Sequence, residues 1–143
     1  MFNFLKTLLS SFFLKNKEPK INTIKPFFDK LTRTEYEAHP NFNYTLEEIF
    51  KYNKSDCEDR TLALAKHMHD NGFKNIRILH LSWEQEKPGH TAILYQNKVF
   101  DATATNKEDK YVYFNYDYDL YILEFKFKII INSHYREGDL IVW

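Results

Sequence analysis

The fold is decided by SDCEDRTLALAKHM (residues 55–68), which predicts a helix that begins at the only cysteine of the chain. Asp56 is a good N-cap, acids follow it in the first turn, and Asn71-Gly72 has the residue types that end helices. Cys57 therefore falls in the first turn, where free backbone N–H groups and the positive end of the helix dipole favour a thiolate. The same N–H groups can hydrogen-bond a developing oxyanion.

Composition places this helix in one globular domain. The chain has 143 residues, of which 43% are apolar and 17% aromatic, so a packed core is expected rather than disorder. Lysine plus arginine equals aspartate plus glutamate at 20 each, and this balance argues against a nucleic-acid partner. A single cysteine excludes an internal disulfide and a cysteine-rich zinc site, and three glycines exclude glycine-rich phosphate loops.

The first 20 residues are predicted to stand apart from a domain formed by residues 21–143. Met1–Leu14 has apolar side chains at helical spacing, and polar Lys15–Lys25 is interpreted as a linker. The apolar run is shorter than the roughly 20 residues that cross a bilayer. Three roles remain open for it: docking on this domain or on a partner protein, lying on a membrane surface, or acting as a signal peptide. We expect a cytoplasmic protein, with a membrane-surface association through residues 1–14 as the alternative.

The rest of the sequence predicts helices first and strands afterwards. Short helices are expected at Phe27–Glu37 and at Leu46–Tyr52, the second opened by the capping-box pattern of Thr45 and Glu48. After Gly72 the apolar period becomes extended, and strands are expected at residues 75–82, 89–95, 98–102, 120–131 and 138–143, with loops at 83–88 and 106–110 and an ambiguous aromatic stretch at 111–118. This order indicates an α+β fold with an antiparallel sheet packed on the central helix.

Hairpin geometry supplies partners for the cysteine. A cysteine nucleophile needs a base within reach and a group that orients the base. If the strands at 89–95 and 98–102 pair through Gln96-Asn97, residues whose numbers sum to about 193 face each other. His90 and Asp101 are then diagonal neighbours on one face. Cys57 shares a helix face with residues that should pack on the sheet, so its thiol is expected to point toward this pair.

Three motifs carry a resemblance to a known family: Asp-Cys-Glu-Asp (56–59), Gly-His-Thr-Ala-Ile-Leu (89–94) and Val-Phe-Asp-Ala-Thr (99–103). They resemble the transglutaminase-like core of the papain-like superfamily and are most similar to bacterial transglutaminase-like cysteine proteinases, over about Thr45 to Thr105. The resemblance implies Cys57 as nucleophile, His90 as general base and acid, and Asp101 as the residue that holds the imidazole tautomer. It also implies acyl transfer through a thioester on a protein or peptide amide, by hydrolysis or cross-linking, with no metal or organic cofactor.

A second hypothesis is a catalytically silent relative that binds a peptide or protein in the same groove. It need not keep the three residues Cys57, His90 and Asp101 together.

Two details of the chemistry remain open. The oxyanion could be bound by the backbone N–H of Cys57 or by an upstream side chain, with Tyr52 and Asn53 as candidates. The three carboxylates beside Cys57 oppose its ionisation, so we expect them to turn away toward helix caps, Arg60 or the preceding loop. Ionisation of the thiol would then depend on proton transfer to His90.

Overall fold

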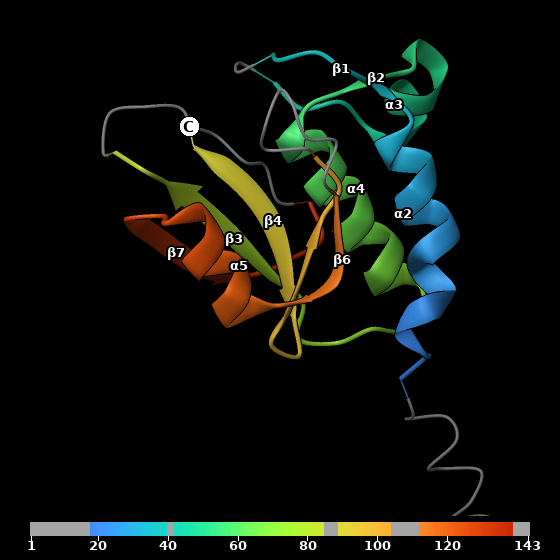
Figure 1. Ribbon diagram of the computed structural model, residues 1–143. Coiled ribbons are helices and arrows are strands. Elements are labelled where there is room, and N and C mark those ends of the chain that lie inside the picture. The colour runs from blue at the N-terminus through green and yellow to red at the C-terminus, as the bar shows by residue number, and fades with distance from the viewer. Residues whose placement is uncertain (1–17, 40–41, 85–88, 104–111, 139–143) are drawn as a thin grey trace, which may run out of the picture.

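The computed structural model describes residues 18–39, 42–84, 89–103 and 112–138 (Figure 1). Its elements in chain order are the 3-10 helix η1 (Ile21–Ile24), α2 (Lys25–Thr32), β1 (Glu35–Tyr36), α3 (Leu46–Tyr52), β2 (Lys54–Ser55), α4 (Cys57–Asp70), β3 (Arg77–Ser82), β4 (His90–Tyr95), β5 (Lys98–Asp101), β6 (Tyr113–Asp117), α5 (Tyr118–Phe125) and β7 (Ile129–His134). Among the described residues, no helix has the length and apolar character needed to span a membrane.

Capping fixes the start of α4, and this places the cysteine. Asp56 accepts a hydrogen bond from the Asp59 N–H at 2.9 Å, and the Asp59 carboxylate accepts one from the Asp56 N–H at 2.9 Å. This reciprocal pair is a capping box, the device that also opens α3 at Thr45. The helices predicted at Leu46–Tyr52 and from Cys57 onward are confirmed. Their caps are local signals that the sequence shows directly.

Five strands form an antiparallel sheet in the order β6-β5-β4-β3-β7. Strands β4 and β5 pair as Ile93 with Phe100 and Tyr95 with Lys98, which is the register predicted from the hairpin. Gln96 and Asn97 both have positive φ, as a two-residue turn matched to the strand twist requires. The α+β fold with an antiparallel sheet is confirmed.

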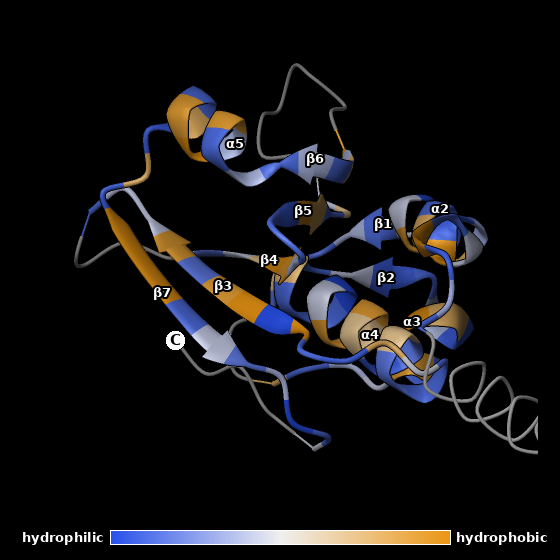
Figure 2. Ribbon diagram, turned by 90° about the horizontal axis from the view of Figure 1, so that it is seen from below, coloured by the Kyte–Doolittle hydropathy of each residue, from blue (hydrophilic) through white to orange (hydrophobic). Residues whose placement is uncertain are grey.

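Helices cover both faces of this sheet. On one face, α4 packs on β4 and α2 packs on α4, around a core that includes Ile78, Ile93 and Phe100. On the other face, α5 lies over a second core that includes Leu79, Leu81 and Val99. Figure 1 shows the two helical layers on opposite sides of the strands, and Figure 2 shows the hydrophobic residues that open β7 at the edge of the sheet.

The predicted long strand at residues 120–131 is wrong. The chain instead forms α5, turns at Lys126 in a left-handed conformation, and enters β7. Asp117 starts the helix because its carboxylate accepts a hydrogen bond from the Leu120 N–H at 3.0 Å. The alternation of charged and aromatic residues at 124–128 suggested a strand, but it spans a helix end and a turn.

Other boundaries differ in smaller ways. Pro26 lies in the first turn of α2, where a missing N–H costs nothing, so this helix begins inside the predicted linker and ends at Thr32. The short strand β1 follows and pairs in parallel with β2. The ambiguous aromatic stretch contains β6. The predicted helix at 1–14 and the loop at 106–110 lie outside the described residues, as does nearly all of the predicted strand at 138–143.

Candidate active site

Cys57 is the first residue of α4, and its side chain is buried, with the residue 5% exposed. The helix face that it opens is buried as predicted, since Thr61, Leu64, Ala65 and Met68 all lie in the interior. The hydroxyl of Thr91 on β4 donates to the Thr61 hydroxyl at 3.1 Å, so this face is fixed to the strand that carries His90. The start of α4 is therefore held against the beginning of β4.

His90 and Asp101 form a buried pair across the hairpin. His90 Nε2 lies 2.7 Å from Asp101 Oδ2, and Asp101 is 1% exposed. Burial lowers the pKa of His90, but the charge and hydrogen bond of Asp101 outweigh it and raise that pKa to about 10. The imidazole consequently keeps its proton at neutral pH. Its Nε2 faces the carboxylate, which leaves Nδ1 for the sulfur.

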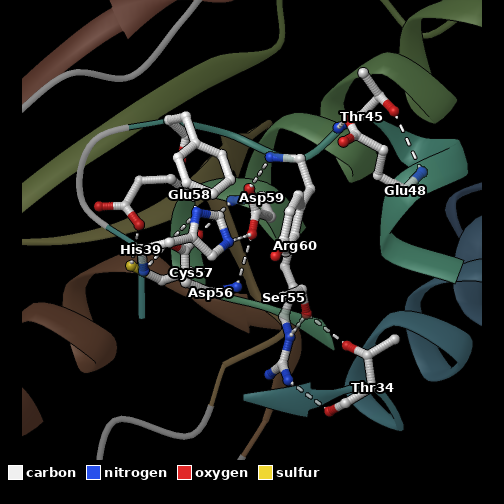
Figure 3. A network of polar contacts seen from close by, with 12 residues as sticks. Thr34, His39, Thr45, Glu48, Ser55, Asp56, Cys57, Glu58, Asp59 and Arg60 are labelled. Carbon is white, nitrogen blue, oxygen red and sulfur yellow. Dashed lines mark hydrogen bonds and ion pairs between the residues drawn. The ribbon is translucent and has the colours of Figure 1, made fainter. Parts of the chain in front are cut away.

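The sulfur lies against both His90 and Glu58. Burial raises the pKa of the Cys57 thiol, the hydrogen bond and charge of His90 act to lower it, and the charge of Glu58 acts to raise it. The net shift is upward, so the helix start alone does not produce a thiolate. Glu58 Oε2 lies 3.3 Å from Cys57 Sγ and accepts a hydrogen bond from the S–H group. The prediction that the neighbouring carboxylates turn away is wrong for Glu58, which lies toward the sulfur (Figure 3).

Asp56 and Asp59 do turn away from the sulfur, toward a histidine that sequence reasoning left without a role. His39 Nε2 lies 2.5 Å from Asp59 Oδ2 (Figure 3), and His39 Nδ1 lies 2.7 Å from the Phe42 carbonyl oxygen. Burial raises the pKa of Asp59 to about 7. His39, Asp56 and Asp59 place potential metal-ligand atoms within 4.8 Å of one another. Capping N–H groups and the His39 ring already bind these carboxylates, so a cation would have to displace the ring.

Asp101 has two further partners that orient it. The Tyr121 hydroxyl donates to Asp101 Oδ2 at 2.8 Å, and the Thr103 N–H donates to Oδ1 at 2.9 Å. Tyr121 comes from α5 and is fully buried. Sequence reasoning missed this residue because it placed residue 121 on a strand. An Asp117 N-cap ahead of an apolar run was the local signal for the helix.

The two side chains predicted as oxyanion donors, Tyr52 and Asn53, lie at the end of α3. Tyr52 is 49% exposed and packs near Tyr44, and Asn53 caps the end of α3 in a left-handed conformation. Tyr36 on β1 lies near the site, and burial together with the charges of Cys57 and Asp56 raises its pKa to about 12. The backbone N–H of Cys57, at the open end of α4, remains the donor that the fold supplies.

Comparisons with known proteins are sparse. The sequence matches no protein-family model and no curated protein. Among solved structures, the chain is similar to Legionella pneumophila LapG, with a TM-score of 0.49 and 12% sequence identity over 69% of this chain and 60% of LapG. The similar region thus spans less than two thirds of LapG.

Proposed function

We propose that this protein is a transglutaminase-like cysteine peptidase or amidase that acts on protein or peptide amides through a thioester on Cys57. One observation carries the proposal: a helix start and a hairpin, far apart in sequence, bring the sulfur of Cys57 to an imidazole that Asp101 holds at 2.7 Å. A buried carboxylate, histidine and thiol in this order are the parts that acyl transfer requires.

The charges set the order of the proton transfers. Because His90 holds its proton to about pH 10, the reactive state is a Cys57 thiolate beside a His90 imidazolium, formed when the thiol loses its proton to solvent. The sequence had suggested that the thiol proton goes to His90. In the state proposed here His90 already carries a proton, which is available for the leaving group.

The reaction then proceeds in two steps. The thiolate attacks the amide carbon, and the developing oxyanion accepts a hydrogen bond from the Cys57 N–H. His90 gives its proton to the leaving amine as the C–N bond breaks, which leaves a thioester and a neutral imidazole. In hydrolysis, His90 takes a proton from water as the water attacks the thioester. The thiolate leaves, and the imidazolium is restored.

Alkylation by iodoacetamide tests the nucleophile. We expect mass spectrometry at pH 7 to show slow labelling of Cys57 in the folded protein, because burial and Glu58 raise the pKa of the thiol while His90 acts to lower it. His90→Ala should slow the labelling further, whereas His134→Ala, on the exposed strand β7, should leave the rate unchanged. Equal labelling of the wild-type protein and His90→Ala would contradict a catalytic pair.

One observation favours the alternative, a silent fold that binds a peptide or protein. Cys57 is 5% exposed, and its S–H group donates a hydrogen bond to Glu58, as an unreactive thiol would. Under this alternative His90→Ala should leave the rate of iodoacetamide labelling at Cys57 unchanged. Product analysis of a peptide library incubated with the wild-type protein and with Cys57→Ser gives a second readout, since only an enzyme produces fragments that depend on Cys57.

A further inference from the structure

A pocket of about 350 Å³ lies beside the candidate active site. Its walls come from the chain around β1, from α4 and from the segment after β5, and include Thr34, Tyr36, Arg60, Ala102 and Thr103. Arg60 follows Cys57 by one helical turn, and Ala102 follows Asp101 directly. A substrate held at Cys57 would therefore extend a neighbouring group toward this pocket.

The pocket has a buried cation in its wall. Arg60 is 5% exposed, and its guanidinium donates to Ser55 Oγ at 2.8 Å and to the Thr34 carbonyl oxygen at 2.8 Å (Figure 3). It also donates to the Ala102 carbonyl oxygen at 2.9 Å. All three acceptors are neutral. Within the described parts of the chain, no carboxylate oxygen lies within 4.0 Å of this guanidinium.

A buried charge of this kind is costly unless an opposite charge balances it. Burial lowers the pKa of Arg60, and the more distant charges of Asp101 and Asp56, which act to raise it, offset this only in part. Each Nη of a guanidinium carries two N–H groups, and each Nη of Arg60 donates one described hydrogen bond. A second N–H on each Nη is left for an incoming acceptor.

The other lining groups suit an anion. Every other residue of the pocket wall is uncharged, and Tyr36 and Thr103 contribute hydroxyl groups. The centre of the Tyr36 ring lies 5.9 Å from the guanidinium carbon, and the residue is 54% exposed. A pKa of about 12 keeps the Tyr36 hydroxyl protonated and able to donate. Guanidinium and hydroxyl donors together match the oxygens of a carboxylate.

We propose that this pocket is a specificity subsite that binds a carboxylate of the substrate through Arg60 and Tyr36. The inference rests on the proposed function for its biological meaning, because it names the class of peptide that would be brought to Cys57. That peptide carries either an aspartate or glutamate side chain or a free C-terminal carboxylate next to the bond that is attacked.

Three small compounds separate these sources: N-acetylglutamate methylamide has a side-chain carboxylate, N-acetylglutamine a terminal one, and N-acetylglutamine methylamide none. We expect one or both carboxylates to shift the amide NMR signals of Tyr36, Thr103 and Val112, with a Kd on the order of 1 mM. The neutral compound should bind at least about tenfold more weakly, which is about 1.4 kcal/mol. Equal shifts with the neutral compound, or none with either carboxylate, would overturn the subsite.

Matched variants at the pocket wall complete the test. Val112 lines the pocket and is 41% exposed, so a substitution there should leave the fold intact, whereas replacing Arg60 would also remove three internal hydrogen bonds. Val112→Glu puts a competing carboxylate beside Arg60 and should weaken binding of the carboxylate compounds about tenfold relative to Val112→Gln. Equal binding to the two variants contradicts the proposal.

This binding requires no chemistry at Cys57. The carboxylate compounds can therefore fail to bind while Cys57 reacts with iodoacetamide, or they can bind while the thiol does not react. Each result tests only one of the two proposals.

Discussion

At the scale of single residues, the reactivity of the candidate site depends on whether the sulfur of Cys57 keeps its proton. His90 acts to lower the pKa of Cys57, while burial and Glu58 act to raise it, with a net upward shift. A helix start is commonly expected to activate a cysteine, yet here the acid that follows the cysteine faces the thiol. Glu58 therefore raises the pH at which Cys57 becomes reactive.

Glu58→Gln tests this dependence. Removing the negative charge should lower the pKa of the thiol, so the alkylation rate should rise with pH from a lower midpoint than in the wild-type protein. Well below the midpoint, each unit by which the pKa falls raises the thiolate fraction about tenfold. The measurement is the rate of iodoacetamide labelling from pH 6 to 10, with Glu47→Gln, exposed on α3, as the control. An unchanged midpoint would show that Glu58 does not control the sulfur.

Arg60 and His39 show what single-residue reading of the sequence leaves out. Both are buried by partners that are distant in the chain: Arg60 by Thr34 and Ala102, and His39 by Asp59. No local pattern marks such contacts, because they depend on how separate segments pack. Cys57, in contrast, was recognised from its own neighbours, since a helix cap is a short-range signal.

At the scale of elements, the two halves of the site differ in how far the sequence predicts them. The β4–β5 hairpin follows from strand alternation and from a two-residue turn, so its register and the meeting of His90 with Asp101 could be predicted. Helix α5 could not be predicted in the same way. Its eight residues are mostly apolar without a helical stripe, and packing on the sheet buries only Tyr121 among them.

Helix α5 brings the Tyr121 hydroxyl to Asp101, and Tyr121→Phe tests the effect of this hydrogen bond on the site. The substitution keeps the ring and removes the donor to Asp101 Oδ2, a hydrogen bond to a charged group that contributes roughly 1.5–3 kcal/mol. Stability should fall by about that amount. Because the carboxylate then has fewer competing donors, it should hold the His90 proton more tightly, and NMR titration of His90 should show a higher pKa.

Tyr118→Phe, on the same helix, provides the matched control and should leave the His90 titration unchanged. A purely structural role for Tyr121 predicts a loss of stability with no change in that titration. Such a result would remove Tyr121 from the groups that position Asp101.

At the scale of the whole molecule, the site lies where the two faces of the sheet and the N-terminal part of the chain meet. Cys57 comes from the α4 layer, and Tyr121 comes from the α5 layer on the opposite face. His90 and Asp101 are carried by the strands between them. The β1–β2 pair, which lies outside the main sheet, is joined to this assembly through Arg60.

Arg60 thus connects three segments through its hydrogen bonds to Ser55, Thr34 and Ala102, and Arg60→Ala should destabilise the folded protein. It leaves Ser55 Oγ and the carbonyls of Thr34 and Ala102 without this donor, and we expect the free energy of unfolding to fall by on the order of 3 kcal/mol. Urea unfolding measures the loss, with Arg77→Ala, exposed on β3, expected to change stability by less than about 0.5 kcal/mol. If the two variants unfold at the same urea concentration, Arg60 contributes little to holding the fold together. Its burial would then be explained by the carboxylate subsite alone.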